Sequence, residues 1–307
     1  LLSSIYPAFF LSAFHPVEGI KGKLKAGREG KAFRNTLVIF QFAVSIILII
    51  CTATVFQQLT YMSDKDVGFN KENLLIIKNV EHLKNGEALT EATLNLPGIT
   101  NSSRSSSLPP RVYGGDKFSA EEMNNETFSL NYTSSDERFL STLDIQLKFG
   151  RNFSKDMPGD HERVILNEAA LKRIGWEANE SVIGKKIFSP GGEFTFEVIG
   201  VVNDFNYWSL ANPIEPMAIF HINSKNLFGE GDKEFITLRV APQGTEAWEN
   251  TITSINTMWK TYDGDSPFQY EFVDQAFAET FKTQTQFGQA LSVMAGLAVL
   301  IASLGLL

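Results

Sequence analysis

Cysteine is almost absent from this chain, whose 307 residues include a single one, Cys51. One cysteine excludes an intrachain disulfide, so any folded part must be held together by its own apolar core. Histidine is scarce too, with four residues scattered along the chain. None has a second histidine at the spacing of a zinc-protease helix, so we expect no metal site.

Sequence signatures of common catalytic sites are also missing. The nearest approach to a phosphate-binding loop, Gly22-Lys-Leu-Lys-Ala-Gly27, is followed by Arg28-Glu29 where Lys-Ser/Thr is required. There is no G-x-S-x-G motif, and Cys51 lies within an apolar run. We therefore expect a chain that is not an enzyme, that binds no cofactor and that does not hydrolyse ATP by itself.

Charged residues are missing from two long stretches, residues 35–63 and 283–307. The first contains an uncharged, mostly apolar run from Leu37 to Phe56, and the second is mostly apolar from Phe287 onward. A helix needs roughly 20 apolar residues to cross the hydrocarbon core of a bilayer. The sequence therefore predicts transmembrane helices at residues 37–58 and 287–307, the second of them truncated.

Basic residues crowd into the segment directly before the first predicted span. They are Lys21, Lys23, Lys25, Arg28, Lys31 and Arg34. The positive-inside rule makes residues 21–36 a cytoplasmic linker and puts the large polar block, residues 59–272, on the other side of the membrane. The linker is either a topology signal or a contact for anionic lipid.

The polar block has an excess of acidic residues, as does the whole chain with 35 acidic against 27 basic residues. Nucleic-acid binding needs clustered Lys and Arg on the folded domain, so we expect no nucleic-acid partner.

Strands and helices alternate in this block. Apolar runs predict strands in NLLIIKNV from Asn73, FTFEVIGVV from Phe194 and EFITLRV from Glu234. Helices are expected over HLKNGEALTEATLNL, with Leu83, Leu89 and Leu94 on one face, and near residues 245–262. RVILNEAALKRIGW reads as a strand and a short helix with Asn167 as N-cap and Gly175 as stop. The expected fold class is α+β, with transmembrane helices flanking the outer domain.

Two further segments have distinct compositions. Residues 102–131 are rich in Ser, Pro, Gly and Asn, which favours a solvated loop with an irregular strand or two. From Val273 the chain has no Pro, and no Gly until Gly288. We expect a stalk helix over 273–286 that continues without a break into the second span.

The motif VNDFNYW allows two interpretations. In the structural one, Val201 and Val202 are buried strand, Asn203-Asp204 is a turn, and Phe205 and Tyr207 are packing residues. In the functional one, an aromatic cluster of Phe205, Tyr207 and Trp208 next to Asp204 faces a partner or hydrophobic cargo.

Three segments resemble permeases of the FtsX/MacB class of ABC transporters, in particular the two-unit type of Bacteroidetes. YPAFFLSAFHPVEGIKGKLK is similar to the exit of a permease unit, through Pro7, Ala8, Pro16, Glu18 and Ile20. RNTLVIFQFAVSIILI is similar to the first helix of the next unit. The succession GRNFSKD, VILNEAALKRIGW, VIGKKI and VIGVVNDFNYWSL resembles the MacB-like periplasmic core domain.

The resemblance implies a fragment in which residues 1–20 end a preceding permease unit. Residues 59–272 would form a periplasmic mixed αβ domain, built from small subdomains, at the bacterial inner membrane. It implies a separate ATPase subunit that binds ATP, and mechanotransmission through the stalk for export or extraction of peptides, antibiotics or lipoproteins. A periplasmic adaptor or a second permease unit remains open as a partner, besides membrane lipid. The alternative is a membrane-anchored sensor whose outer domain binds a small ligand.

Overall fold

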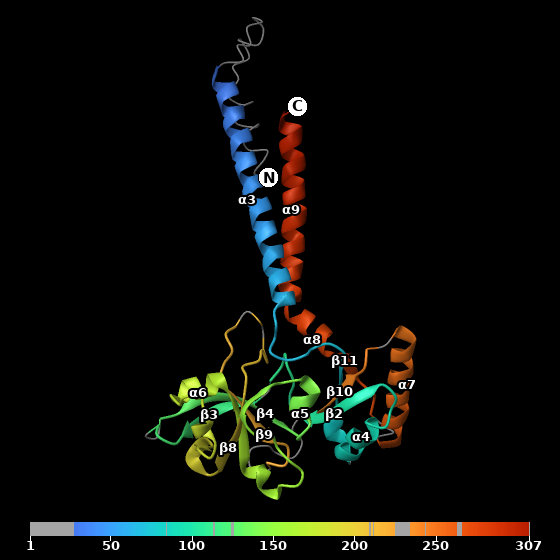
Figure 1. Ribbon diagram of the computed structural model, residues 1–307. Coiled ribbons are helices and arrows are strands. Elements are labelled where there is room, and N and C mark those ends of the chain that lie inside the picture. The colour runs from blue at the N-terminus through green and yellow to red at the C-terminus, as the bar shows by residue number, and fades with distance from the viewer. Residues whose placement is uncertain are drawn as a thin grey trace, which may run out of the picture. The chain divides into compact units, whose positions relative to one another are not determined.

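The computed structural model describes residues 28–83, 85–112, 114–123, 126–208, 210, 212–224, 234–242, 244–262 and 266–306 (Figure 1). The chain forms two compact units. One comprises Leu1–Leu59 with Gln284–Leu307, and the other is Thr60–Thr283. The predicted end of a preceding permease unit, residues 1–20, and the basic residues Lys21, Lys23 and Lys25 lie outside the described residues.

The described part of the first unit consists of two long apolar helices, α3 (Arg28–Asp64) and α9 (Lys282–Leu306). Within them, Arg34–Met62 and Lys282–Leu304 are long and apolar enough to cross a membrane, as predicted. The two helices approach closely at Gly288, where a Cβ would lie 3.1 Å from a methyl carbon of Val55. Small residues commonly permit such approaches between membrane helices.

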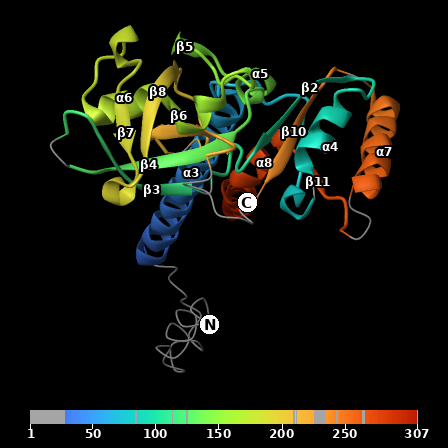
Figure 2. The same cartoon turned by 90° about the horizontal axis from the view of Figure 1, so that it is seen from below.

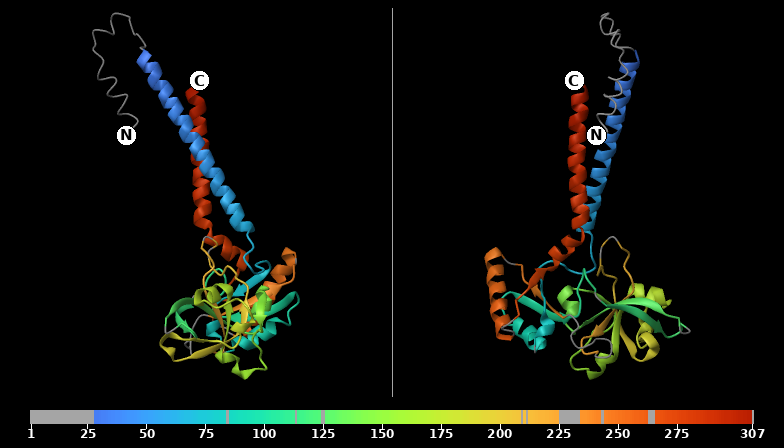
Figure 3. Two further views of the ribbon diagram at one scale, coloured as in Figure 1. Left: turned by 60° about the vertical axis from the view of Figure 1, so that its left-hand side comes forward. Right: turned by 180° about the vertical axis from the view of Figure 1, so that it is seen from behind.

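The second unit contains two lobes, which Figures 2 and 3 show in opposite halves of it. The sheet lobe has four antiparallel strands in the order β11 (Tyr270–Phe272), β1 (Leu74–Ile77), β10 (Phe235–Val240) and β2 (Ile99–Ser105). Helices α4 (Gly86–Thr93) and α7 (Thr245–Tyr262) cover it. Its apolar cluster is centred on fully buried Trp259 and includes Leu75, Leu89 and Ile255.

The barrel lobe is a closed ring of strands in the order β4, β3, β7, β8, β6, β9 and back to β4. Their bounds are β3 (Gly114–Ala120), β4 (Phe128–Ser135), β6 (Arg163–Asn167), β7 (Lys186–Phe188), β8 (Thr195–Val202) and β9 (Met217–His221). β5 (Leu147–Gly150) pairs with β8, and α6 (Glu168–Ile174) follows β6. Closing the ring removes free strand edges, and its core is aromatic, with Phe118, Phe128, Phe196 and Phe220.

The two lobes join at β2 and β4, which pair only at Ser105 and Ser135. A third apolar cluster, which we call the central cluster, extends across this junction. It takes Leu74 and Ile76 from the sheet lobe, Ile165 and Ile219 from the barrel lobe, and residues of α5 (Phe139–Leu143) and α8 (Val273–Thr280). The lobes are therefore held together by shared apolar burial more than by strand pairing.

Most of the expected elements are confirmed. The strands β1, β8 and β10 and the helix α7 lie where the apolar patterns put them. The Asn167 side chain accepts a hydrogen bond from Ala170 N, and Gly175 ends α6 in the left-handed conformation, as predicted. The predicted helix over HLKNGEALTEATLNL corresponds to α4, but it begins later than expected. Asn85 caps α4 and the helix starts at Gly86, so the inclusion of Leu83 was wrong.

The expectation of a largely solvated loop over residues 102–131 was wrong. This region contributes most of β2, all of β3 and the first part of β4, and Ser102, Ser103 and Ser105 are fully buried. Pairing with β10 satisfies the backbone of β2, while small side chains fit the closely packed interior. Tertiary packing thus overrides the composition, which by itself favours turns.

The expected uninterrupted stalk helix was also wrong. Helical geometry is interrupted at Phe281 (φ −107°, ψ 3°), which separates α8 from α9. The Phe281 N–H bonds to Ala278 O in a tighter turn, and the ring packs against the central cluster. Burial of this side chain supplies a reason for the break that neither Pro nor Gly signals.

Candidate functional site

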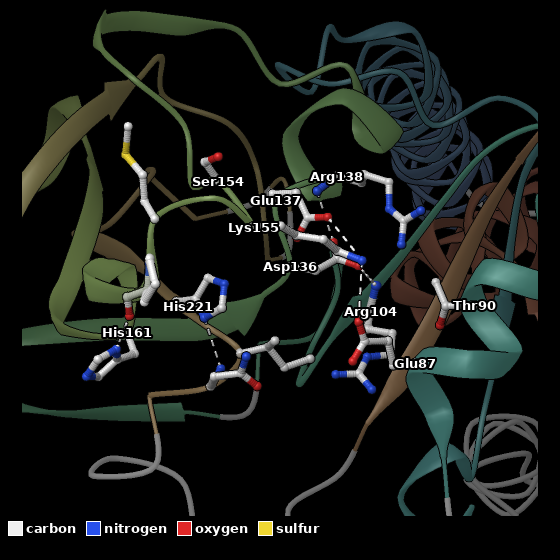
Figure 4. Close-up of a pocket in the computed structure, with 14 residues that line it drawn as sticks. Glu87, Thr90, Arg104, Asp136, Glu137, Arg138, Ser154, Lys155, His161 and His221 are labelled. Atoms are coloured by element: carbon white, nitrogen blue, oxygen red, sulfur yellow. Dashed lines mark hydrogen bonds and ion pairs between the residues drawn. The ribbon is translucent and has the colours of Figure 1, made fainter.

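A cleft of about 700 Å³ lies between the two lobes (Figure 4). The sheet lobe supplies Glu87 and Thr90 of α4 and Arg104 of β2. The other lining residues belong to the turn before α5, the segment after β5 and the end of β9. They are Asp136, Glu137, Arg138, Ser154, Lys155, Met157, Pro158, His161, His221, Ile222 and Asn223. Both signs of charge are therefore concentrated where the lobes face each other.

Ion pairs link α4 to the residues on the other side of this cleft. Arg138 donates two hydrogen bonds to the Glu91 carboxylate, at 3.0 and 2.9 Å. Lys155 Nζ lies 2.7 Å from a Glu91 oxygen and 3.3 Å from one of Glu87, and Figure 4 shows Lys155 directed toward Glu87. The hydrogen bonds from Arg138 and then Lys155 lower the pKa of Glu91 to about 2. We call this set of contacts, Glu87 and Glu91 with Arg138 and Lys155, the ionic latch.

Asp136 is buried behind the ionic latch. Its carboxylate accepts hydrogen bonds from Arg104 N at 2.8 Å and from Arg138 N at 3.1 Å. Burial disfavours the charged carboxylate and raises its pKa to about 6, although these hydrogen bonds act in the opposite direction. Asp136 thereby ties β2 of the sheet lobe to the turn that carries Arg138.

On the barrel-lobe side of the cleft, a second buried carboxylate, Asp160, holds the segment after β5 in place. Arg151 forms a bidentate pair with Asp160 at 2.9 and 2.7 Å, and Ser154 N also donates to Asp160. Burial raises the pKa of Asp160, but these hydrogen bonds outweigh it, so the pKa lies below its ordinary value. The nearby His221 ring packs edge-on against Phe153, and burial lowers its pKa, which favours neutral imidazole.

The cleft is suited to electrostatic contact, since its charged side chains form ion pairs. Its cations are engaged: Arg104 pairs with Glu234 at 3.0 Å, and Arg138 and Lys155 belong to the ionic latch. Across the part of the chain that the structure describes, no group of three His, Cys, Asp or Glu side chains is arranged to hold a metal ion. What this arrangement can do is exchange partners, because partly exposed ion pairs are weak and separate at low cost.

The structure separates the residues of the VNDFNYW motif. Phe205 and Tyr207 are 0% and 3% exposed and pack in the central cluster, whereas Trp208 is 48% exposed. Asp204 accepts a hydrogen bond from Ala169 N at the start of α6, and burial raises its pKa. The four residues thus do not share one exposed surface.

Trp208 instead borders a smaller hollow of about 250 Å³. Its other lining residues are Asn131, Asn206, Tyr207, Asn212, Pro213, Ile214 and Glu215. The Asn131 amide donates to both Tyr207 Oη and Glu215 Oε2 at 3.0 Å, which fixes one wall.

The basic residues predicted as a linker are divided between described and undescribed parts of the chain. Arg28, Lys31 and Arg34 lie in α3, so the helix begins well before the apolar run. The assignment of these residues as a topology signal remains a prediction.

The sequence analysis did not identify the cleft. Two signals were available, since Glu87 and Glu91 are four apart and share one helix face, and Asp136-Glu137-Arg138 is a compact charged run. Neither indicates that the two segments meet, because Glu91 and Arg138 are 47 residues apart in sequence.

A comparison with solved structures found similarity to periplasmic or extracellular domains of transporters. The periplasmic region of MacB from Actinobacillus actinomycetemcomitans is 18% identical with a TM-score of 0.49, over 72% of this chain and 98% of that one. A domain of a permease protein from Porphyromonas gingivalis is 17% identical, with a TM-score of 0.45 over 68% and 98% of the two chains. The extracellular domain of the transporter YknZ from Gram-positive bacteria is 14% identical, with a TM-score of 0.43 over 60% and 87%.

A search of curated proteins found no match. The model of one protein family, the MacB-like periplasmic core domain, matches residues 37–286. That match covers most of the chain, including most of the first apolar helix and the whole outer unit. The chain therefore belongs to the family of the MacB-like periplasmic core domain and is an ABC transporter permease.

Proposed function

We propose that this chain couples ATP hydrolysis by a separate ATPase subunit to motion of its periplasmic domain. The motion would serve export or extraction of peptides, antibiotics or lipoproteins. The observation that carries the proposal is the family match over residues 37–286, which includes the outer unit and reaches into both apolar helices.

The arrangement along the chain supports an inner-membrane location with a periplasmic domain. The two candidate spans, Arg34–Met62 and Lys282–Leu304, directly flank the unit Thr60–Thr283. Six basic residues cluster before the first span, whereas Lys282 alone stands at the start of the second, which favours a cytoplasmic start for α3.

ATP would be bound by the partner, since the chain lacks a Walker A sequence. Besides the ATPase, we propose contact with membrane lipid, and an adaptor or a second permease unit remains open as a further partner.

The contacts at the cleft are weak enough to allow the proposed motion of the lobes. Partly exposed ion pairs contribute about 0–1 kcal/mol each, so the ionic latch can open without a large cost. The central cluster, by contrast, is buried and shared by both lobes. Relative movement of the lobes about the central cluster would open or close the cleft and expose Arg138 and Lys155.

Complex formation with an ATPase is the direct test. The full-length chain, expressed with a neighbouring ATP-binding subunit, should co-purify with it from detergent and change its rate of ATP hydrolysis. If no ATPase associates while the full-length chain binds a small ligand, the membrane-anchored sensor replaces this proposal.

Lobe motion can be measured in the same complex. Donor and acceptor dyes would be attached at Glu193→Cys in the barrel lobe and Glu246→Cys in the sheet lobe, both exposed, in a Cys51→Ser background. We expect the energy transfer to change on ATP addition. The matched control carries Glu193→Cys with Glu177→Cys, both in the barrel lobe, and its energy transfer should stay constant.

A further inference from the structure

An exposed tryptophan lies in the segment between β8 and β9. We call the described residues of this segment, 203–208, 210 and 212–216, the aromatic loop. Of its rings, Phe205 and Tyr207 are buried, whereas Trp208 is 48% exposed beside exposed Pro213. Trp208 is therefore the one ring of the described part of this loop that is free to contact a surface outside the domain.

The aromatic loop is fixed to the chain that follows α3. Asn206 N donates to Val67 O at 2.7 Å. Next to it, Gly68 (φ +80°) packs so closely that a Cβ would lie 2.6 Å from Asp204 O. Only glycine allows this approach with this backbone conformation. The loop is therefore held within a few residues of Met62, the end of the first candidate span.

The chain that leads into the second span lies in the same cluster. Met62, Phe205, Tyr207 and Phe277 all belong to the central cluster, and Ile214 and Phe281 pack against it. Phe281 directly precedes Lys282, where the second candidate span begins. Both ends of the outer unit thus emerge beside the cluster that buries the aromatic loop.

Chain length limits how far these ends can be from a bilayer. The six residues from Phe56, where the apolar run ends, to Met62 rise about 9 Å in a helix, and the five from Lys282 to Phe287 rise about 8 Å. The headgroup layer on each side of the hydrocarbon core is roughly 5–8 Å thick. The ends of the outer unit therefore lie at or near the headgroup region.

Tryptophan is the side chain best suited to that region, because it joins a large apolar ring to one N–H donor. The charges of the aromatic loop are the carboxylates Asp204 and Glu215. Such a loop gains nothing from anionic headgroups, so its contact with lipid would be apolar and insensitive to salt.

We propose that Trp208 docks into the headgroup region of the periplasmic leaflet and anchors the outer unit to the membrane surface. This inference rests on the proposed membrane location. In this proposal the aromatic loop is a lipid contact, and the contact limits movement of the outer unit on the membrane.

Quenching by brominated lipid tests the contact in the full chain. The chain would be placed in nanodiscs of zwitterionic phosphatidylcholine, with bromine either at a shallow acyl position or absent. We expect shallow bromine to quench part of the tryptophan fluorescence, and Trp208→Phe to lose that part at both low and high salt. The matched control is Trp248→Phe, since Trp248 packs against Phe272 in the sheet lobe and should keep the quenching.

A label on Cys51, the only cysteine, reports membrane insertion independently. The label should be quenched by lipid that carries bromine deep in the acyl chain, which would support the membrane location. If the label is quenched in this way but the Trp208→Phe variant is quenched as strongly by shallow bromine as the wild type, the lipid contact is overturned and the membrane location stands. An unquenched Cys51 label would overturn both. Equal loss in the Trp208→Phe and Trp248→Phe variants would also contradict the assignment, because it would not be specific to the aromatic loop.

Discussion

The junction between the two lobes has an apolar part and a charged part, and they differ in what holds them. The central cluster combines buried side chains from both lobes and from α8. The cleft is lined by ion pairs whose partners are partly exposed, such as Glu91 at 45% and Lys155 at 49%. Apolar burial gives a large free energy that salt does not screen, whereas exposed ion pairs give little.

This difference suggests a division of work within the outer unit. The central cluster contains the segments of the outer unit that lead to α3 and α9 in the sequence. The cleft is the part that can change at low cost. The following predictions test this comparison, beginning with the largest expected effect.

Removing a ring from the central cluster should be the most damaging change. Phe205→Ala should lower the free energy of unfolding by about 3–5 kcal/mol, because it deletes a fully buried ring and leaves a cavity. Thermal unfolding in detergent should show a midpoint lower by roughly 6–20 °C. Trp208→Ala is the control from the same loop and should change stability by less than about 0.5 kcal/mol. Equal effects of the two variants would contradict the separation of the motif.

Asp136 lies at the boundary between the two parts. Asp136→Ala should cost about 2–3 kcal/mol, because it leaves the N–H groups of Arg104 and Arg138 without their acceptor. Asp136→Asn keeps one acceptor oxygen and should cost less. Chemical unfolding of the two variants measures this difference, and an equal loss would show that the carboxylate charge, rather than the acceptor, matters.

The stability should depend on pH through the same carboxyl group. Its pKa is about 6 in the folded chain and about 3.8 in the unfolded chain, so the folded state binds the proton more tightly. The stabilisation from protonating Asp136 is fully present below about pH 3.8 and is lost as pH rises through about 6. Relative to Asp136→Asn, the wild type should therefore become less stable between pH 4 and 6 and change little above that range. Parallel pH profiles of the two proteins would refute the raised pKa.

The ionic latch should contribute least to stability. Glu91→Gln should lower the free energy of unfolding by no more than about 1 kcal/mol, and the loss should shrink in high salt. Glu193→Gln, at an exposed position of the barrel lobe, controls for the change in net charge. The energy transfer between the two lobes should nevertheless differ for Glu91→Gln. A loss as large as that of Phe205→Ala would contradict the comparison between the two parts of the junction.

Local sequence patterns predicted much of the fold. A strand such as β8 shows its burial as a continuous apolar run, and α6 carries both its N-cap Asn167 and its stop Gly175 within a few residues. The buried serines of β2 form neither an apolar run nor an alternating pattern, so the composition of this region predicts a loop.

The candidate site was much less predictable, because its contacts join distant parts of the chain. Glu91 and Arg138 meet only after the lobes have packed, and no local feature of either segment specifies the other. Within VNDFNYW, the sequence could not separate Phe205 from Trp208, since both are large aromatic side chains in one turn.

The sequence by itself determined the two apolar helices, the alternation of strands and helices between them and the resemblance to a permease, because composition and short-range periodicity encode these properties. Tertiary structure alone decided the closed barrel, the charged cleft, the break at Phe281 and the exposure of Trp208. Each of these depends on which surfaces are buried against each other, and burial is a property of the packed chain as a whole.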